Sequence, residues 1–542
     1  MVLRFIDAAA QNAEKIIIMT DKEWYYPGEL LHFNLDVFDA CGDSLSGFSK
    51  IAYVELIGED SRPVHQMKVA IDDAHSNGSI SIGENVLTGK YTVVAYTNWM
   101  KNFGAGTFSR QQVQVINPLK MAAVNISHKI EMQNAGNTSA IELQMPKTVF
   151  GKRELVPVSF SAGDDSRITV SVFKLDALQR GIKEVDNEFE EKPCIRDATR
   201  NYPFIMENRG HIIAGRVVDK RSQQPVPGVR GYLSVINNPD DLYVATSDSS
   251  GNILFEVDRI SARKELVFQT NSNTDSNYTI EMVSPFAGKV KPSNSIEKTN
   301  VFETMPAVVN EAIVSAQVQR YYMLKGLALQ DSAANSNMPF YGKPDAYYLM
   351  SDYVHFSTVE EILREYVTTV AVQKRNGIAY PVIYNMLTDR IPFTSPPLIL
   401  VNGVPVFDYP RFMNMNTDEF YSIGVVGKKY FMGHQVFHGI IDVRLKHALA
   451  NYGRLATVVD YDGISEAGEF YSPIYENESQ RKSRKPDFRN VLYWNPWLRK
   501  GPDGRYSFAF YSSDLEGEYA IVIRRVSNKG EVDTHQTLIR VK

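Results

Sequence analysis

Two histidines lie four residues apart in the segment GHQVFHGII, at His434 and His438. On a helix they would share a face, and a zinc protease would carry a glutamate directly after the first histidine. Gln435 occupies that position here. The following GIIDVRL is typical of a strand, on which residues four apart are separated by about 13 Å, too far for one zinc ion. The pattern therefore favours a structural role for both histidines.

The acidic segment VVDYDGISEAGEF is a second candidate for metal binding, with Asp460, Asp462 and Glu469 around Gly463. An EF-hand loop needs oxygen ligands at its first, third and fifth positions, a glycine at the sixth and a glutamate at the twelfth. This segment lacks that register, which favours a turn. The sequence also contains no phosphate-binding loop, nucleophile elbow or dinucleotide fingerprint. We therefore predict no catalytic, cofactor-binding or metal-binding residues, no cofactor, and a protein that is not an enzyme.

Aromatic and basic clusters offer two further candidate sites. Trp24, Tyr25 and Tyr26 are able to form a sugar-binding platform, but they precede the turn Pro27-Gly28, which favours packing beneath it. The run RKSRK at 481–485 lies in a polar stretch and is predicted to be a solvated loop. Because no other segment is strongly basic, we expect no nucleic-acid partner.

Length and composition describe an ordinary folded protein of several domains. The chain has 542 residues, of which 44% are hydrophobic and 22% charged, with a net charge of −5. Its two cysteines, Cys41 and Cys194, leave one bridge open as an option. No run of about 18 apolar residues occurs, so we expect no transmembrane helix. The first residues are too polar for a signal peptide, which indicates either a cytoplasmic protein or a leader removed before this chain begins.

Alternating apolar and polar residues with regular turn signals predict β-sandwiches along most of the chain. Residues 14–117 alone contain seven such strands. One helix is expected over 355–367, where Ser357 and Glu360 are spaced as a capping box. In PPLILVNGVPV (396–406), Asn402-Gly403 predicts a tight turn between two buried strands.

The first of these regions resembles the MG2 module of macroglobulin-type envelope proteins of Bacteroidota. The resemblance is carried by IIIMTDKEWYYPGELLHFNLDVFD, LSGFSKIAYVELIGED and LTGKYTVVAYTNWMKNFG. Protease-trapping macroglobulins use a thioester within a Cys-Gly-Glu-Gln segment. Neither Cys41 nor Cys194 lies in such a segment, so covalent trapping is not expected.

Two later regions carry further resemblances. IAGRVVDKRSQQPVPGVRGYLSV followed by TSDSSGNILFEV, with Asp248 and Gly251, is similar to carboxypeptidase regulatory-like domains, which implies a transthyretin-like sandwich without peptidase activity. Residues 340–445 resemble the plug of TonB-dependent receptors, through FSTVEEILREYVTTVAVQ, PPLILVNGVPV and GVVGKKYFMGHQVFHGIIDVRL. A receptor barrel needs more than about 200 residues in strands, and only 97 (542 − 445) follow Leu445. We therefore expect a plug-like module without its own barrel.

Together these features predict a mainly β chain of tandem β-sandwiches, macroglobulin-like and transthyretin/Ig-like, with one α+β plug-like domain. The expected domains are an MG2-like sandwich at 1–118, a second macroglobulin-like sandwich at 119–206, a regulatory-like sandwich at 207–305, the plug-like domain at 306–450 and a C-terminal sandwich at 451–542. Ten residues are expected to have structural roles: Pro27, Gly28, Trp99, Gly215, Gly228, Gly251, Gly403, Gly439, Trp494 and Pro496.

The expected function follows from the resemblances. They imply a non-catalytic scaffold or accessory subunit of the cell envelope, periplasmic or outer-membrane-associated, with a lipid anchor as one option. Its partner would be an outer-membrane β-barrel protein or complex, either a TonB-dependent transporter or the barrel-insertion or secretion machinery. The alternative is a surface protein that binds glycans or peptides.

Overall fold

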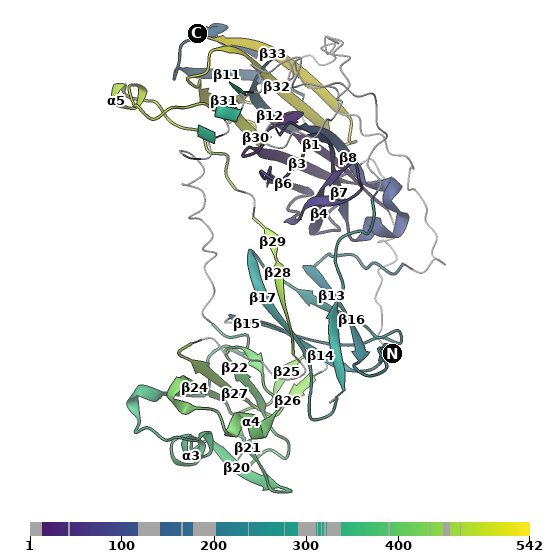
Figure 1. The fold of residues 1–542 in the computed structure, drawn as a ribbon, viewed down its shortest axis with the longest axis vertical. Helices are drawn as coiled ribbons and strands as arrows, with labels where there is room; N and C mark the ends of the chain where they lie inside the picture. The colour runs from purple at the N-terminus through teal and green to yellow at the C-terminus, as the bar shows by residue number, and fades with distance from the viewer. Residues whose placement is uncertain are drawn as a thin grey trace. The chain divides into compact units, whose positions relative to one another are not determined.

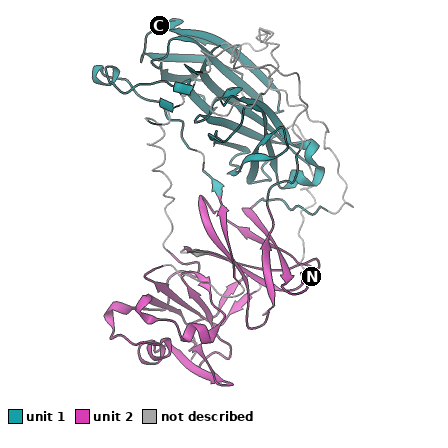
Figure 2. Cartoon of the chain, in the orientation of Figure 1, with its two compact units in different colours: residues 1–208, 286–331, 464–542 teal, residues 209–285, 332–463 magenta. Residues whose placement is uncertain are grey.

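The computed structural model describes residues 13–41, 44–117, 141–163, 166–176, 202–236, 238–258, 260–275, 277–290, 338–388, 391–433, 435–447, 456–466 and 468–542, with a few positions between 310 and 321. Within these residues the strands form nine sheets, so the predicted mainly β class of tandem sandwiches is confirmed. The chain divides into two compact units, residues 1–208, 286–331 and 464–542 in the first and 209–285 and 332–463 in the second (Figure 2).

The first sandwich lies in the first unit and contains residues 13–117. One of its sheets consists of β1 (Glu14–Thr20), β3 (Leu30–Asp39) and β6 (His75–Ser81). The other has the spatial order β2 (Trp24–Tyr25), β8 (Ser109–Val115), β7 (Gly89–Thr97), β4 (Ile51–Gly58), β5 (Pro63–Ala70) and β29 (Ile464–Ser465). Two short 3-10 helices, η1 (Trp99–Phe103) and η2 (Ala105–Thr107), follow β7 in the chain. Apolar side chains from both sheets form one core, as the alternating pattern predicted.

The second sandwich is built from two distant parts of the sequence. One sheet has the order β31 (Tyr506–Tyr511), β11 (Leu155–Ser161) and β9 (Glu142–Gln144). The other has the order β10 (Val149–Phe150), β33 (Val532–Val541), β32 (Gly517–Ser527), β12 (Ser166–Lys174) and β30 (Val491–Leu498). The short helix α5 (Glu478–Arg481) precedes β30. Ranges 119–206 and 451–542, which the sequence placed in separate domains, therefore share both sheets, because β12 pairs with β30 and β32.

The two sandwiches of the first unit pack sheet against sheet. Ile17, Met19 and Phe38 of the first sandwich form an apolar cluster with Val526 of the second. Beside this cluster, Asn34 Nδ2 donates to Thr169 Oγ1 at 3.0 Å. Strand β3 is consequently buried on both faces along most of its length.

A third sandwich forms part of the second unit. One of its sheets has the order β16 (Asn252–Val257), β13 (His211–Asp219), β18 (Tyr278–Met282). The other has the order β15 (Asn238–Thr246), β14 (Arg230–Val235), β17 (Arg263–Thr270), β28 (Thr457–Asp462). Gly251 has a φ of 77°, and a Cβ there would lie 2.6 Å from Pro225 Cβ, so the turn before β16 requires glycine. Strand β28 comes from the range predicted as the C-terminal domain.

Residues 338–447, which we call the α+β region, complete the second unit (Figure 1). Their main sheet has the order β19 (Ala346–Leu349), β24 (Phe420–Val426), β27 (Ile440–Leu445), β22 (Leu398–Val401) and β23 (Val404–Pro405). Two hairpins flank it, β20 (Val370–Arg375) with β21 (Ile378–Ile383) and β25 (Tyr430–Met432) with β26 (Gln435–Phe437). The helical elements are η4 (Met350–Asp352), α3 (Val359–Glu365), α4 (Tyr409–Met413) and η5 (Thr417–Glu419).

Two local predictions for the α+β region can be compared with its backbone. Asn402 and Gly403 have φ values of 49° and 84° and join β22 to β23, which confirms the tight turn. The helix is confirmed as α3, but the predicted cap is wrong by one residue. Thr358 and Glu361 form the capping box, not Ser357 and Glu360. Among the described residues, no helix is long and apolar enough to cross a membrane.

His32 of β3 lies between the two sandwiches of the first unit and gives a pH-dependent prediction. Its ring centroid is 5.3 Å from that of Phe470 and 6.2 Å from that of Trp494. Burial, aided by Lys22, lowers the pKa of His32 to about 4. The unfolded chain therefore binds one more proton between about pH 6.5 and pH 4, and the free energy of unfolding falls as the pH drops through that window, by at most about 3 kcal/mol.

We expect His32→Phe to remove this part of the pH dependence and His447→Phe, at an exposed histidine, to leave it unchanged. Urea unfolding followed by tryptophan fluorescence at pH 7, 5.5 and 4 measures how the free energy of unfolding of the first unit depends on pH, because all four tryptophans lie in that unit. Asp21, whose pKa burial raises to about 7, acts in the opposite sense and is present in every variant. If the free energy of unfolding of His32→Phe fell with pH as steeply as that of the wild-type chain, the prediction would be contradicted.

Candidate functional site

The residues that the sequence singled out for metal chemistry do not assemble a site. His438 is half-buried with its ring edge against Phe393, centroids 5.6 Å apart, and burial, followed by nearby Lys429, lowers its pKa. His434 lies outside the described residues. Asp460 pairs with Arg263 at 2.7 Å across β28 and β17. Within the described part of the chain, no group of three or more potential ligands could hold a metal ion.

The aromatic run before the Pro27-Gly28 turn is a packing element, as favoured from the sequence. Trp24, Tyr25 and Tyr26 are at most 6% exposed, so no ring face is open to a ligand. The Tyr25 hydroxyl donates to Asp21 Oδ1 at 2.7 Å, and Lys22 pairs with Glu29 at 2.6 Å. These buried contacts lie beneath the Pro27-Gly28 turn and stabilise it.

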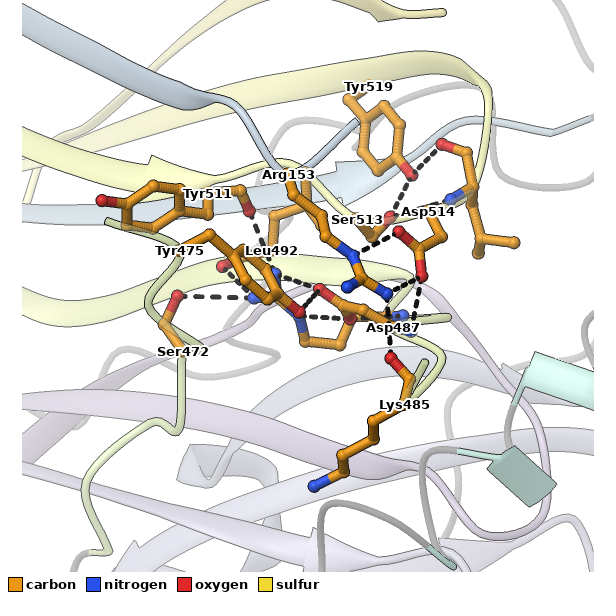
Figure 3. A network of polar contacts seen from close by, with 12 residues as sticks. Arg153, Ser472, Tyr475, Lys485, Asp487, Leu492, Tyr511, Ser513, Asp514 and Tyr519 are labelled. Carbon is orange, nitrogen blue, oxygen red and sulfur yellow. Dashed lines mark hydrogen bonds and ion pairs between the residues drawn. The ribbon is translucent and has the colours of Figure 1, made fainter. Parts of the chain in front are cut away.

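A larger polar network lies in the second sandwich and is centred on two arginines (Figure 3). Arg153 forms a two-pronged pair with Asp514, Nε to Oδ1 at 2.7 Å and Nη2 to Oδ2 at 2.6 Å. Its guanidinium also donates to the carbonyl oxygens of Ser483 and Lys485, both at 2.8 Å. Burial opposes ionisation of Asp514, but the hydrogen bonds from Arg153 and the Asp487 N–H, together with the charges of Arg153 and Lys152, lower the pKa of that carboxyl.

The second arginine of this network, Arg489, is almost fully buried beside Asp487. Its Nε and Nη2 each donate to Asp487 at 2.8 Å, and Nη2 also reaches the Tyr511 carbonyl at 3.0 Å. Tyr475 donates to Asp487 at 3.0 Å. Because the arginine donors and carboxylate acceptors are occupied by the chain itself, the network fastens residues 472–489 onto the sandwich. We assign it a structural role.

An open hollow in the α+β region is the best candidate for a binding site. Its volume is about 420 Å³, and it lies where η4, α3 and the start of β24 meet. Tyr353, Phe356, Tyr366 and Tyr421 supply aromatic surface. Tyr353 and Tyr421 are 38% and 53% exposed, so their rings are accessible from solvent.

Hydrogen bonds tie the two walls of this hollow together. Tyr366 of the α3 end donates to the Val354 carbonyl at 2.9 Å, and Thr417 donates to the carbonyl of Phe356. His355 Nε2 lies 3.1 Å from Asp418 Oδ1. The walls are therefore held in place without a ligand, which reduces the ordering cost of binding one.

The rim of the hollow carries both hydrogen-bond donors and acceptors. Lys446 Nζ donates to the Asp418 carbonyl at 2.6 Å and keeps two further donors. The Asp418 carboxylate is about two-thirds exposed and can accept additional hydrogen bonds. Aromatic faces beside a few polar groups are the usual lining of a small-ligand site.

Sequence reasoning did not identify this hollow. Its residues come from 349–366, from 417–421 and from Lys446, and only the paired sheet brings them together. The run YYLMSDYVHF was the one available signal, because it places several aromatic residues directly before a capped helix.

Comparison with known proteins identifies no family. No protein-family model and no curated protein matches the chain. Among solved structures, Salmonella alpha-2-macroglobulin reacted with methylamine aligns with 98% of this chain and 40% of its own length, at 10% identity and a TM-score of 0.25. Escherichia coli alpha-2-macroglobulin activated by porcine elastase aligns with 98% and 44%, at 10% identity and 0.25.

A third structure, the Escherichia coli adhesin FdeC, aligns with 51% of this chain and 65% of its own length, at 11% identity and a TM-score of 0.14. The chain thus spans about two fifths of the length of the macroglobulins that it matches. Because similarity at this level identifies neither a family nor a function, the function must be inferred from the chain's own residues.

The network around Arg153 gives a stability prediction with a control at the neighbouring residue. Arg153→Met removes the donor to four carbonyl groups and leaves the buried end of Asp514 with only the Asp487 N–H, and we expect the first unit to lose about 3 kcal/mol of unfolding free energy. Lys152→Met removes only an exposed pair with Glu516 and should cost less than about 1 kcal/mol. Urea unfolding followed by tryptophan fluorescence compares the two variants. Equal losses of unfolding free energy would contradict the structural role of the Arg153 network.

Proposed function

We propose that this chain is a non-catalytic scaffold or accessory subunit of the cell envelope that docks through its α+β region on an outer-membrane β-barrel protein or complex. The first sandwich is assigned in this proposal to the MG2 type of Bacteroidota envelope proteins, the third to the regulatory-like type and the α+β region to the plug type. The partner is a TonB-dependent transporter or the barrel-insertion or secretion machinery.

The observation that carries the proposal is the exposure of large apolar side chains on the α+β region. Leu387, Val354, Phe431 and Met338 are 77%, 76%, 66% and 65% exposed, and they are the four most exposed large apolar side chains among the described residues. Large apolar side chains that are mostly exposed are candidates for contact with a partner. A region with this surface gains free energy by burying it against a partner protein.

The polar contacts of the first unit favour a scaffold. Three buried arginines inside it, Arg153, Arg167 and Arg489, pair with the carboxylates of Asp514, Asp36 and Asp487. Such pairs stabilise a fixed shape and leave little polar capacity for chemistry. The exposed surface of the α+β region therefore offers the more suitable contact for a partner.

Co-purification tests the proposal directly. The tagged chain is incubated with detergent-solubilised outer membranes of a Bacteroidota species, captured and analysed by mass spectrometry. We expect one outer-membrane barrel protein to be retained, and the double variant Leu387→Asp, Phe431→Asp to lose it, because each change places a charge where the partner would bury an apolar side chain.

Leu87→Asp is the matched control, because Leu87 is 50% exposed on the first sandwich, and it should retain the partner. Circular dichroism checks that all variants are folded. Recovery of no barrel protein, or equal recovery with the wild-type chain and the double variant, would refute docking through the α+β region.

The state of Cys41 supports an oxidising compartment. Cys41 is disulfide-bonded, and the sequence contains one other cysteine, Cys194, which lies outside the described residues. Disulfides persist in oxidising compartments such as the bacterial periplasm. We expect the native chain to show no thiol that reacts with Ellman's reagent and the reduced, denatured chain to show two. A reactive thiol in the unreduced, denatured chain would contradict this.

A further inference from the structure

The hollow between η4, α3 and β24 has the features of a carbohydrate subsite. Tyr353 packs against Tyr366 with ring centroids 4.6 Å apart, and 38% of Tyr353 and 53% of Tyr421 remain exposed at the hollow. Both carry a phenolic hydroxyl, so each combines an apolar surface with a hydrogen-bonding tip. A pyranose ring has the complementary structure, with C–H groups on its faces and hydroxyls around its edge.

The polar groups at the rim match the hydroxyl edge of a sugar. A sugar hydroxyl both donates and accepts hydrogen bonds. The Asp418 carboxylate accepts and the Lys446 ammonium donates, and their charges offset one another. A neutral saccharide fits this pair better than a strongly charged ligand, because neither sign of charge is left in excess.

The backbone around the hollow argues against an added peptide strand as its occupant. Strand β19 ends at Leu349, and the chain then turns through η4, where Tyr353 N donates to the Met350 carbonyl. Strand addition needs a row of unpaired backbone groups along a sheet edge. Strand β19 is the edge of its sheet but is only four residues long, and the carbonyl groups of Val354, Phe356 and Asp418 beside the hollow already accept hydrogen bonds, so little backbone is left for an added strand.

We propose that this hollow binds one or two units of a neutral oligosaccharide, with Tyr353 and Tyr421 stacking on the sugar faces and Asp418 and Lys446 bonding to the hydroxyls. The volume of about 420 Å³ is large enough for this. The walls are already fixed by Tyr366, Thr417 and His355, so the subsite is formed before the sugar arrives. This activity can be tested apart from docking on a barrel partner, because Leu387 and Phe431 do not line the hollow, although Val354 does.

Affinity electrophoresis with the full chain tests the proposal. Native gels contain soluble starch, xylan, mixed-linkage β-glucan, galactomannan or yeast mannan, and binding appears as retarded migration. We expect retardation by at least one neutral polysaccharide. Calorimetry with the matching hexasaccharide should then give a dissociation constant that rises about tenfold in Tyr421→Ala and in Tyr353→Ala, since each removes one stacking partner.

Tyr347→Ala is the matched control, because Tyr347 lies on β19 with 58% exposure and does not line the hollow. Its affinity should equal that of the wild-type chain. Asp418→Asn keeps an acceptor of the same size and should bind several-fold more weakly. Thermal unfolding confirms that each variant is folded, so a loss of binding is not a loss of structure.

Three outcomes would overturn the proposal. They are no retardation by any of the five polysaccharides, equal loss in Tyr347→Ala and Tyr421→Ala, or binding of a random-peptide library that Tyr353→Ala and Tyr421→Ala abolish. The double variant Leu387→Asp, Phe431→Asp should still bind sugar, so failure of barrel docking and failure of sugar binding are distinguishable.

Discussion

A strand inside a sheet must hydrogen-bond to a neighbour on each side, and β12 finds both of its neighbours near the end of the sequence. Its central residues are buried, so water cannot satisfy their backbone groups. The second sandwich therefore exists only when residues 491–541 return to residues 149–174. The packing between the two sandwiches of the first unit, and the double burial of β3, depend on this return.

The same return path contributes to the other sandwiches. On its way back the chain adds β28 to the third sandwich and then β29 to the first, each as the last strand of its sheet. Gly463 separates these strands, and a Cβ there would lie 2.3 Å from the Ile260 carbonyl oxygen, so the crossing requires glycine. The domains are thus nested in the sequence, with the α+β region innermost.

Features set by neighbouring residues were predictable from the sequence. Asn402-Gly403 dictates its turn, and the stripe of Val359, Ile362 and Leu363 identifies α3 and its buried face. The cap was missed by one residue because Ser357 and Thr358 are both competent caps with a glutamate three residues later. The apolar and aromatic residues of β12 and β30 predict two strands but not that they pair, since pairing depends on contacts across the whole fold. The hollow beside Tyr353 was missed for the same reason.

The separation of β12 from its partners also matters while the protein is being made. Strand β12 ends at Lys174, and β30 starts only at Val491. At ribosomal speeds of 5–20 residues per second, those roughly 300 residues take about 15 to 60 s to emerge. Throughout that interval β11 and β12 lack β30, β31, β32 and β33, whose side chains form much of the core that buries their apolar faces. Newly made chains consequently pass through a state with unpaired, aggregation-prone strands.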